Sequence, residues 1–232
     1  MSNAAEIIGG SYNGFPLPSA AYASAPHASP VVLLTLALIL GASLWVFATL
    51  IRRETRHRRR VSLSLWARSH DMRLQAAGGE TPPLLKQFNP RILQLLSGRG
   101  ITLLQIETAD VAATVPTSRR QWNVILRDLN GPWPTTALRP TAHTTSLVDL
   151  FSLSSYPSLM PSERFMVFGV ESRAARALAE STAPALLPPD VALIVSGNCL
   201  LLDFSSRHFD EIEFDRLIDL AEQLAPRLSI GQ

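Results

Sequence analysis

The sequence predicts an α+β protein in which one transmembrane helix is followed by a domain with a largely antiparallel sheet and packed helices. The first observation is an uncharged run of twenty-one residues at 31–51, with a cluster of arginines directly after it. The second is a series of short apolar runs between residues 101 and 204, separated by turn-forming residues as strands are. The third is a run at 210–225 whose apolar residues have helical spacing. Elements in this order favour helices packed on an antiparallel sheet.

Residues 31–51 have the length of a membrane span, because a hydrocarbon core roughly 30 Å thick needs about 20 apolar residues. Ser29 can cap this helix and Pro30 suits its first turn. A buried helix of a soluble protein is one alternative, and the length of the run beside an arginine cluster argues against it. A cleaved signal peptide is another, but no Lys or Arg precedes Arg52.

The flanking charges predict the orientation. Glu6 is the only charged side chain before the run, whereas six arginines, offset only by Glu54, follow within ten residues. The positive-inside rule therefore places the N-terminus outside and the C-terminal domain in the cytoplasm. Heavy use of Arg, Ala, Leu and Pro is associated with bacterial genomes rich in G and C, so the expected membrane is the bacterial cytoplasmic (inner) membrane. The predicted parts are a disordered extracytoplasmic tail (1–29), a transmembrane helix (30–51), a basic juxtamembrane segment (52–61) and a cytoplasmic α+β domain (62–232).

Charge and cysteine content limit the classes of partner. The chain holds 21 Lys+Arg and 19 Asp+Glu, a formal net charge of +2. Six of the arginines and two of the acids precede residue 61, so residues 61–232 hold 15 basic and 17 acidic residues, a net of −2. Such a domain lacks the basic surface that nucleic-acid binding needs. The single cysteine, Cys199, excludes an internal disulfide framework and a cysteine-rich zinc site.

The first half of the domain has three predicted elements. No proline lies between Pro30 and Pro82, so the membrane helix can continue through the arginines toward Ser69. Asn89-Pro90 before residues 91–97 and Gly98 after them predict a short helix. Strands are predicted at 101–107 and 122–127, followed by a break at Asn130-Gly131-Pro132 and an extended segment at 133–140.

The second half alternates helices and strands. The predicted elements are a helical turn at 147–151, a strand at 164–170, a helix at 173–180 capped by Ser172, and a helix at 210–225 stopped by Pro226. Two apolar runs, 191–195 and 199–204, are joined by Ser196-Gly197-Asn198, which predicts a β-hairpin. Asp210 and Glu213 have the spacing of a capping box at the start of the last helix.

One polar cluster resembles catalytic machinery. Asp203, Ser205, Ser206 and His208 lie within six residues of one another. A triad needs groups that converge in space, whereas on an extended strand Asp203 and Ser205 point to one face and the other two residues to the opposite face. We therefore interpret the cluster as a polar strand end. A hydrolase that uses His208 or His143 is the alternative.

We expect no catalytic residue, no cofactor and no metal. Arg139, which precedes a proline, and Arg164, which opens a strand, are candidates for an anion contact or a salt bridge. An internal salt bridge, to Asp149 or Glu163, is the favoured interpretation. The histidines of the domain lack metal-ligand spacing, and no glycine-rich phosphate loop is present.

The membrane-proximal residues suggest two kinds of contact. The juxtamembrane arginines are candidate contacts for anionic lipid head groups, at about 1 kcal/mol each near the surface. They are Arg52, Arg53, Arg56, Arg58, Arg59 and Arg60. Ala37 and Gly41 offer a small-residue surface through which two copies could pair as a homodimer. The expected partners are thus the lipid bilayer and a membrane or cytoplasmic protein, but not nucleic acid.

The stretch from about Leu138 to Leu224 resembles a loose group of bacterial single-pass membrane proteins of unknown function. The resemblance rests on LRPT, SLVDL, ERFMVFG, DVALIVSGNCLLLDFS and FDEIEFDRLIDLAEQL, which begin at residues 138, 146, 163, 190 and 209. It covers somewhat over a third of the chain, implies an anchored cytoplasmic α+β domain, and brings no catalytic residue to carry over to this sequence.

These observations favour a membrane-anchored cytoplasmic domain that acts as a scaffold, adaptor or regulatory binding module, with no identifiable reaction. Two alternatives stay open. One is a membrane-anchored hydrolase, and the other is a sensor of anionic lipid surfaces that uses the six arginines.

Overall fold

The computed structural model describes residues 29–75, 79–109, 119–142 and 145–229, without the side chains of Val32, Arg56, Ser154, Pro161 and Ser229. The chain divides into two compact units, Met1–Glu54 and Thr55–Gln232. The tail predicted at 1–29 lies almost wholly outside the described residues.

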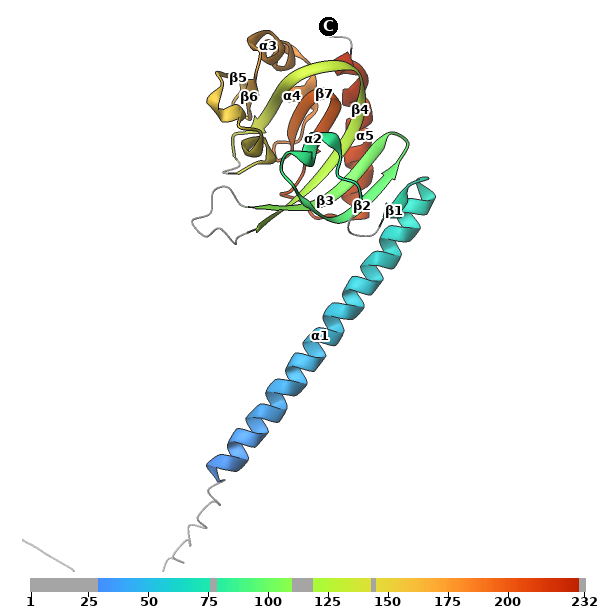
Figure 1. Ribbon diagram of the computed structural model, residues 1–232, viewed down its shortest axis with the longest axis vertical. Helices are drawn as coiled ribbons and strands as arrows, with labels where there is room; N and C mark the ends of the chain where they lie inside the picture. Colours follow the sequence, from blue (N-terminus) through green and yellow to red (C-terminus); the bar gives the residue numbers. More distant parts are fainter. Residues whose placement is uncertain (1–28, 76–78, 110–118, 143–144, 230–232) are drawn as a thin grey trace, which may run out of the picture. The chain divides into compact units, whose positions relative to one another are not determined.

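Helix α1 (Pro30–Ser69) is continuous over 40 residues (Figure 1). It begins at Pro30 and runs through the arginines to Ser69, which confirms the prediction of a helix that extends beyond the apolar run. Large apolar side chains are exposed in its first part, with Leu44 at 68% and Trp45 at 70%. Within the described residues, α1 is the one helix whose length and composition suit a membrane crossing. Near its end, Leu63, Trp66 and Ala67 are buried in the core of the second unit.

A seven-stranded antiparallel sheet forms the centre of the second unit. Its strands are β1 (Arg73–Gln75), β2 (Arg91–Gly98), β3 (Ile101–Ala109), β4 (Arg119–Pro140), β5 (Ser158–Ser162), β6 (Phe165–Gly169) and β7 (Ala192–Asp203). Their order is β1-β2-β3-β4-β6-β5, and β7 also pairs with β4. The long strand β4 pairs with β3 along its first half, with β6 near its end and with β7 along both halves.

Helices cover both faces of the sheet. The helices are α2 (Pro83–Lys86), η1 (Leu147–Phe151), η2 (Leu153–Ser155), α3 (Ser172–Glu180), α4 (Ala183–Leu186) and α5 (Glu211–Ser229). On one face, α3, α4, α5 and the end of α1 bury a core that includes Phe204, Phe209 and Phe214. On the other face, α2, η1 and η2 bury a second core around Ile106, Trp122 and Ile194. The predicted fold class, α+β with an antiparallel sheet and packed helices, is therefore confirmed.

The connection of β2 to β3 is a tight hairpin. Gly98 pairs with Ile101, and Arg99 and Gly100 have φ angles of 53° and 70°, as a type I′ turn requires. A Cβ on Gly98 would lie 2.5 Å from the carbonyl oxygen of Asp71, so this position needs glycine because the backbone after α1 crosses it closely.

The helix predicted at 91–97 is wrong, because these residues form β2. The register shifts between Ile92 and Gln94, which marks a β-bulge. After the bulge, Leu95 is buried on the same face of the sheet as Ile92, and Leu96 is buried on the opposite face. The helix-end signals that led to the prediction have other causes: Asn89 has a positive φ of 43°, and Gly98 belongs to the β2–β3 hairpin.

The hairpin predicted at 191–204 is also wrong, because both apolar runs belong to β7. Its halves do not pair with each other, and both pair with β4. Gly197 has φ of 55° and bends the strand instead of reversing it. The break predicted at Asn130-Gly131-Pro132 is a bulged part of β4 that lies opposite this bend, so the two strands change direction together.

Helix α5 extends past the stop predicted at Pro226 and ends at Ser229. The final turn is anchored by Leu228, whose side chain is buried and whose carbonyl oxygen accepts a 3.0 Å hydrogen bond from Nε1 of Trp133. Tertiary contacts of the last turn thus outweigh the hydrogen bond that the proline cannot donate.

Candidate functional site

The carboxylate of Asp203, at the end of β7, is buried and accepts hydrogen bonds from two loops. Its Oδ2 accepts from the backbone N of Leu147 at 2.8 Å and from Oγ of Ser146 at 3.2 Å. Its Oδ1 accepts from the backbone N and from Oγ of Ser205, at 3.1 and 2.5 Å. Oγ of Ser205 in turn accepts from the backbone N of Asn123 at 3.0 Å. The carboxylate therefore holds the loop before η1 and the end of β7 together.

His208 takes no part in this arrangement. Its side chain is exposed. Among the described residues, no imidazole takes part in the hydrogen bonds of Asp203 and Ser205. Ser206 turns to Asp190, to which its Oγ donates at 3.1 Å. The four residues singled out in the sequence thus separate into a buried Asp–Ser pair, a serine paired elsewhere and an exposed histidine. His143 lies outside the described residues.

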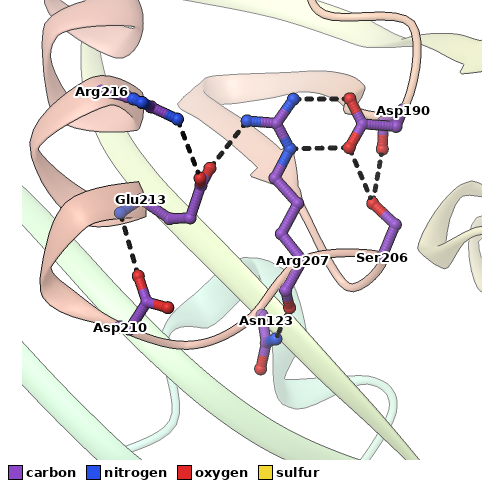
Figure 2. A network of polar contacts seen from close by, with 7 residues as sticks. All are labelled: Asn123, Asp190, Ser206, Arg207, Asp210, Glu213 and Arg216. Atoms are coloured by element: carbon purple, nitrogen blue, oxygen red, sulfur yellow. Dashed lines mark hydrogen bonds and ion pairs between the residues drawn. The ribbon is translucent and has the colours of Figure 1, made fainter.

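Arg207 is the centre of the polar network that follows β7 (Figure 2). Its Nε and Nη2 donate to the two carboxylate oxygens of Asp190, each at 2.6 Å, and its Nη1 donates to Glu213 at 2.7 Å. Its backbone oxygen accepts from Nδ2 of Asn123 at 2.9 Å.

The capping box predicted at the start of α5 is half formed. The backbone N of Glu213 donates to Oδ1 of Asp210 at 3.1 Å, which is one of the two hydrogen bonds of a capping box. The side chain of Glu213 binds Arg207 and Arg216 instead of completing the box.

The electrostatics of this network are those of a fixed ion pair. The hydrogen bond from Arg207 holds the pKa of Asp190 below its ordinary value, although partial burial opposes the shift. The pKa of the Arg207 guanidinium is raised, mainly by its hydrogen bonds to Asp190. Both groups are held in their charged forms and face each other. This arrangement stabilises the turn from β7 into α5 and leaves neither group available as an acid or base.

The two candidate anion-binding arginines lie at the same end of the β4–β6 pairing, where Pro140 pairs with Phe165. Nε of Arg139 lies 3.1 Å from Oδ1 of Asp149 in η1. Nη2 of Arg164 donates to the carbonyl oxygen of Leu187 at 2.8 Å, and its guanidinium lies 5.5 Å from the ring centroid of Phe165. The structure thus gives Arg139 a carboxylate neighbour and Arg164 a carbonyl neighbour, and an external anion at either residue stays a prediction.

The juxtamembrane arginines lie along α1, and the backbones of all six are helical. The side chains of Arg52, Arg53, Arg58 and Arg60 are exposed. Nη2 of Arg59 donates to the carbonyl oxygen of Phe209, just before α5, at 2.5 Å. Contact of these arginines with lipid head groups stays a prediction, and Arg59 has an additional intramolecular role.

The proposed homodimer surface lies in the first part of α1. Ala37 and Gly41 are exposed, and a Cβ on Gly41 would meet nothing within 4 Å. Pairing of two copies through these residues stays a prediction. Among the described residues, no three His, Cys, Asp or Glu side chains are grouped so that they could hold a metal ion.

An open groove of about 910 Å³ lies beside the middle of β7. Side chains of five neighbouring strands line it, together with the segment that leads into α2. The lining includes Gln75, Glu80, Leu84, Leu95, Ser97, Thr102, Leu126, Asp128, Asn198 and Cys199. Leu84, Leu95 and Leu126 belong to or pack against the core on the α2 side of the sheet, so the groove opens on that face.

Cys199 is the one cysteine of the chain and lies in the wall of this groove. Burial raises the pKa of its thiol to about 12, and the negative charge of Asp128 adds to the shift. A thiol with such a raised pKa is a poor nucleophile at neutral pH. Cys199 is therefore less nucleophilic at neutral pH than an ordinary cysteine, and its place in the groove wall makes alkylation of the thiol a test for an occupant of the groove.

Sequence reasoning missed the central residues of the Arg207–Asp190 network and of the groove beside Cys199. Arg207 and Asp190 are seventeen positions apart, and no local motif joins them. The polar residues of the groove come from five strands and one loop, so their proximity follows only from the strand order. A usable signal was present only for Asp203 and Ser205, whose alternate spacing placed both on one side of the strand.

Comparisons with known proteins give one structural likeness. No family model matches the chain, and no curated protein matches it. The chain is similar in structure to the mycobacterial trehalose monomycolate transport factor A, TtfA, with a TM-score of 0.44 and 14% sequence identity. The alignment covers 74% of this chain and 93% of that chain.

Proposed function

We propose that this chain is a single-pass protein of a bacterial cytoplasmic membrane whose cytoplasmic domain is a binding module, acting as a scaffold, adaptor or regulatory partner. The observation that carries the proposal is α1. Its first part exposes large apolar side chains such as Leu44 and Phe47, and arginines follow directly. Water would disfavour so much exposed apolar surface on one helix, whereas a bilayer favours it.

The polar clusters of the domain support binding over catalysis. Asp203, Ser205 and Arg207 make hydrogen bonds that hold loops and helix ends together. In the same domain, the groove beside Cys199 presents polar side chains to open space. A module that recognises a partner needs such an accessible surface and does not need convergent acid, base and nucleophile.

The orientation is tested by cysteine labelling of the full chain in spheroplasts. In a Cys199→Ala background, Ser19→Cys reports on the tail and Arg68→Cys on the end of α1. We expect a membrane-impermeant maleimide to label Ser19→Cys in intact spheroplasts and Arg68→Cys only after permeabilisation. Labelling in the reverse pattern would contradict the orientation, and recovery of the chain from the soluble fraction would contradict the anchor.

A lipid-surface sensor is the second candidate, favoured by the exposed arginines and by the bond of Arg59 to Phe209. Because Arg59 joins α1 to the loop before α5, lipid binding at the arginines could alter the packing of α5. The full chain in nanodiscs should then unfold at a different temperature with anionic lipid than with neutral lipid, and salt should remove the difference. Equal unfolding temperatures would count against this function.

A further inference from the structure

The groove on the α2 side of the sheet has the length of a short peptide. It is lined in turn by Gln75 of β1, Ser97 of β2, Thr102 of β3, Asp128 of β4 and Cys199 of β7. These five strands are neighbours in the sheet. At about 4.8 Å between strands the lining extends roughly 19 Å, which is the length of about six extended residues. A compact metabolite would fill only part of such a groove.

The groove combines an apolar part with a polar part. Leu84, Leu95 and Leu126 supply apolar side chains along its length. The hydroxyl groups of Ser97 and Thr102 and the amides of two further residues, Gln75 and Asn198, supply hydrogen-bonding groups. An occupant that matches this lining has apolar side chains next to polar ones, as an amphipathic peptide does.

The charge of the lining has one sign. Glu80 and Asp128 line the groove, and none of its lining residues is Lys or Arg. Lys86 pairs with Glu80 at 3.2 Å, but both side chains are more than half exposed, so an incoming cation can compete for the carboxylate. Carboxylates only accept hydrogen bonds, and guanidinium and ammonium groups only donate them.

We propose that this groove binds an extended segment of a partner polypeptide in which apolar side chains alternate with Arg or Lys. The proposal rests on the proposed function as a binding module and names its ligand class. In an extended segment alternate side chains point to opposite sides, so apolar residues can pack on Leu95 and Leu126. Neighbouring basic side chains, which are long and flexible, reach the carboxylates of Glu80 and Asp128 at the rim.

The test uses synthetic heptapeptides and the full chain in neutral detergent micelles. The probe is fluorescent Leu-Arg-Leu-Arg-Leu-Arg-Leu, and its binding is followed by anisotropy. The matched control peptide has Glu in place of every Arg. We expect binding of the Arg peptide, at least about tenfold weaker binding of the Glu peptide, and weakening of the first by salt.

The site is assigned by two double variants that each remove two negative charges. Glu80→Gln with Asp128→Asn changes the groove, whereas Glu163→Gln with Glu222→Gln changes two exposed residues outside its lining. We expect the groove variant to bind the Arg peptide about tenfold more weakly, equivalent to about 1.4 kcal/mol, and the control variant to bind like the wild type. Equal affinities of the two variants would overturn the proposal.

The thiol of Cys199 supplies a second readout that needs no added label, because the chain has one cysteine. A saturating amount of the Arg peptide should slow alkylation of Cys199 by iodoacetamide at mildly alkaline pH. Unchanged alkylation with bound peptide would show that the peptide binds elsewhere and would overturn the assignment. Equal protection by butylguanidine alone would also overturn it, because a small cation would then suffice.

Cross-linked capture from native membranes separates this proposal from the proposed function. A partner captured by the wild type and lost from the groove variant supports both. A partner captured equally by both proteins contradicts the groove and leaves the binding module intact. The absence of any partner, with the chain still in the membrane, contradicts the binding module itself.

Discussion

The C-terminal end and the middle of β7 carry polar residues in opposite situations. At the C-terminal end, Asp203 is buried and accepts four hydrogen bonds from Ser146, Leu147 and Ser205. Near its middle, Cys199 and its neighbour Asp128 on β4 line an open groove. The cluster that resembles catalytic machinery in the sequence is therefore structural, and the less conspicuous residues border the accessible space. Closeness of these residues along the chain is weak evidence for catalysis, because Asp203, Ser205 and Ser206 make hydrogen bonds that join structural elements and His208 is exposed.

The largest expected effect of this difference is on stability. Asp203→Ala removes a buried acceptor and leaves several donors without a partner, so we expect it to lower the free energy of unfolding by about 3 kcal/mol. Asp128→Ala removes an exposed carboxylate and should change the same quantity by less than about 0.5 kcal/mol. Urea unfolding of the full chain in micelles, followed by tryptophan fluorescence, measures both. Similar losses in the two variants would remove the distinction between the two regions.

A smaller loss is expected for Arg207→Lys. A lysine keeps the charge but cannot donate in parallel to both oxygens of Asp190 while it also reaches Glu213. We expect a loss of about 2 kcal/mol in the same unfolding experiment. Arg216→Lys, at an exposed position on the same network, is the matched control and should stay close to the wild type.

The dependence of the free energy of unfolding on pH, at acid pH, tests the contribution of Asp190. Its pKa is lowered in the folded chain, mainly by the hydrogen bond from Arg207, so the unfolded chain takes up this proton at a higher pH. The stabilisation is therefore present above the ordinary value of 3.8 and is lost as the pH falls through the lower folded value. Asp190→Asn should make the stability below about pH 4 less steep. An unchanged slope would show that this carboxylate does not contribute.

The smallest expected effect is on the reactivity of Cys199. Burial is the main cause of its raised pKa, and the charge of Asp128 is a further cause. Asp128→Asn should therefore speed alkylation by only about threefold at mildly alkaline pH. Glu163→Gln, which removes a distant charge, should leave the rate unchanged. A rate that stays the same in Asp128→Asn would place this carboxylate outside the electrostatic range of the thiol.

The sequence predicted those parts of the fold that depend on composition and regular spacing. The strands at 101–107 and 122–127 and the last helix follow from apolar runs and periods, and the continuation of the first helix to Ser69 follows from the absence of proline between Pro30 and Pro82. The errors fall where the backbone departs from regular geometry. Asn89 and Gly98 were interpreted as helix ends, but Asn89 has a positive φ and Gly98 belongs to a β-hairpin, and Gly197 bends β7 where a hairpin turn was expected.

The same reasoning could recover only part of the sites. Asp203 and Ser205 are two residues apart, so their common side was visible in the sequence. The ion pair of Arg207 with Asp190 and the groove between Glu80 and Asp128 depend on which strands become neighbours. Strand order is set by the packing of the whole domain, and no local pattern carries it.

The central claim is that the Arg207 network stabilises the fold, whereas the groove beside Cys199 binds a peptide. The affinity of two folded variants for the Leu/Arg heptapeptide tests this claim most directly. Arg207→Lys should be less stable but should bind the peptide with the dissociation constant of the wild type. Glu80→Gln with Asp128→Asn should be as stable as the wild type but bind about tenfold more weakly. The reverse result, with weak binding in Arg207→Lys and unchanged binding in the groove variant, would contradict the account.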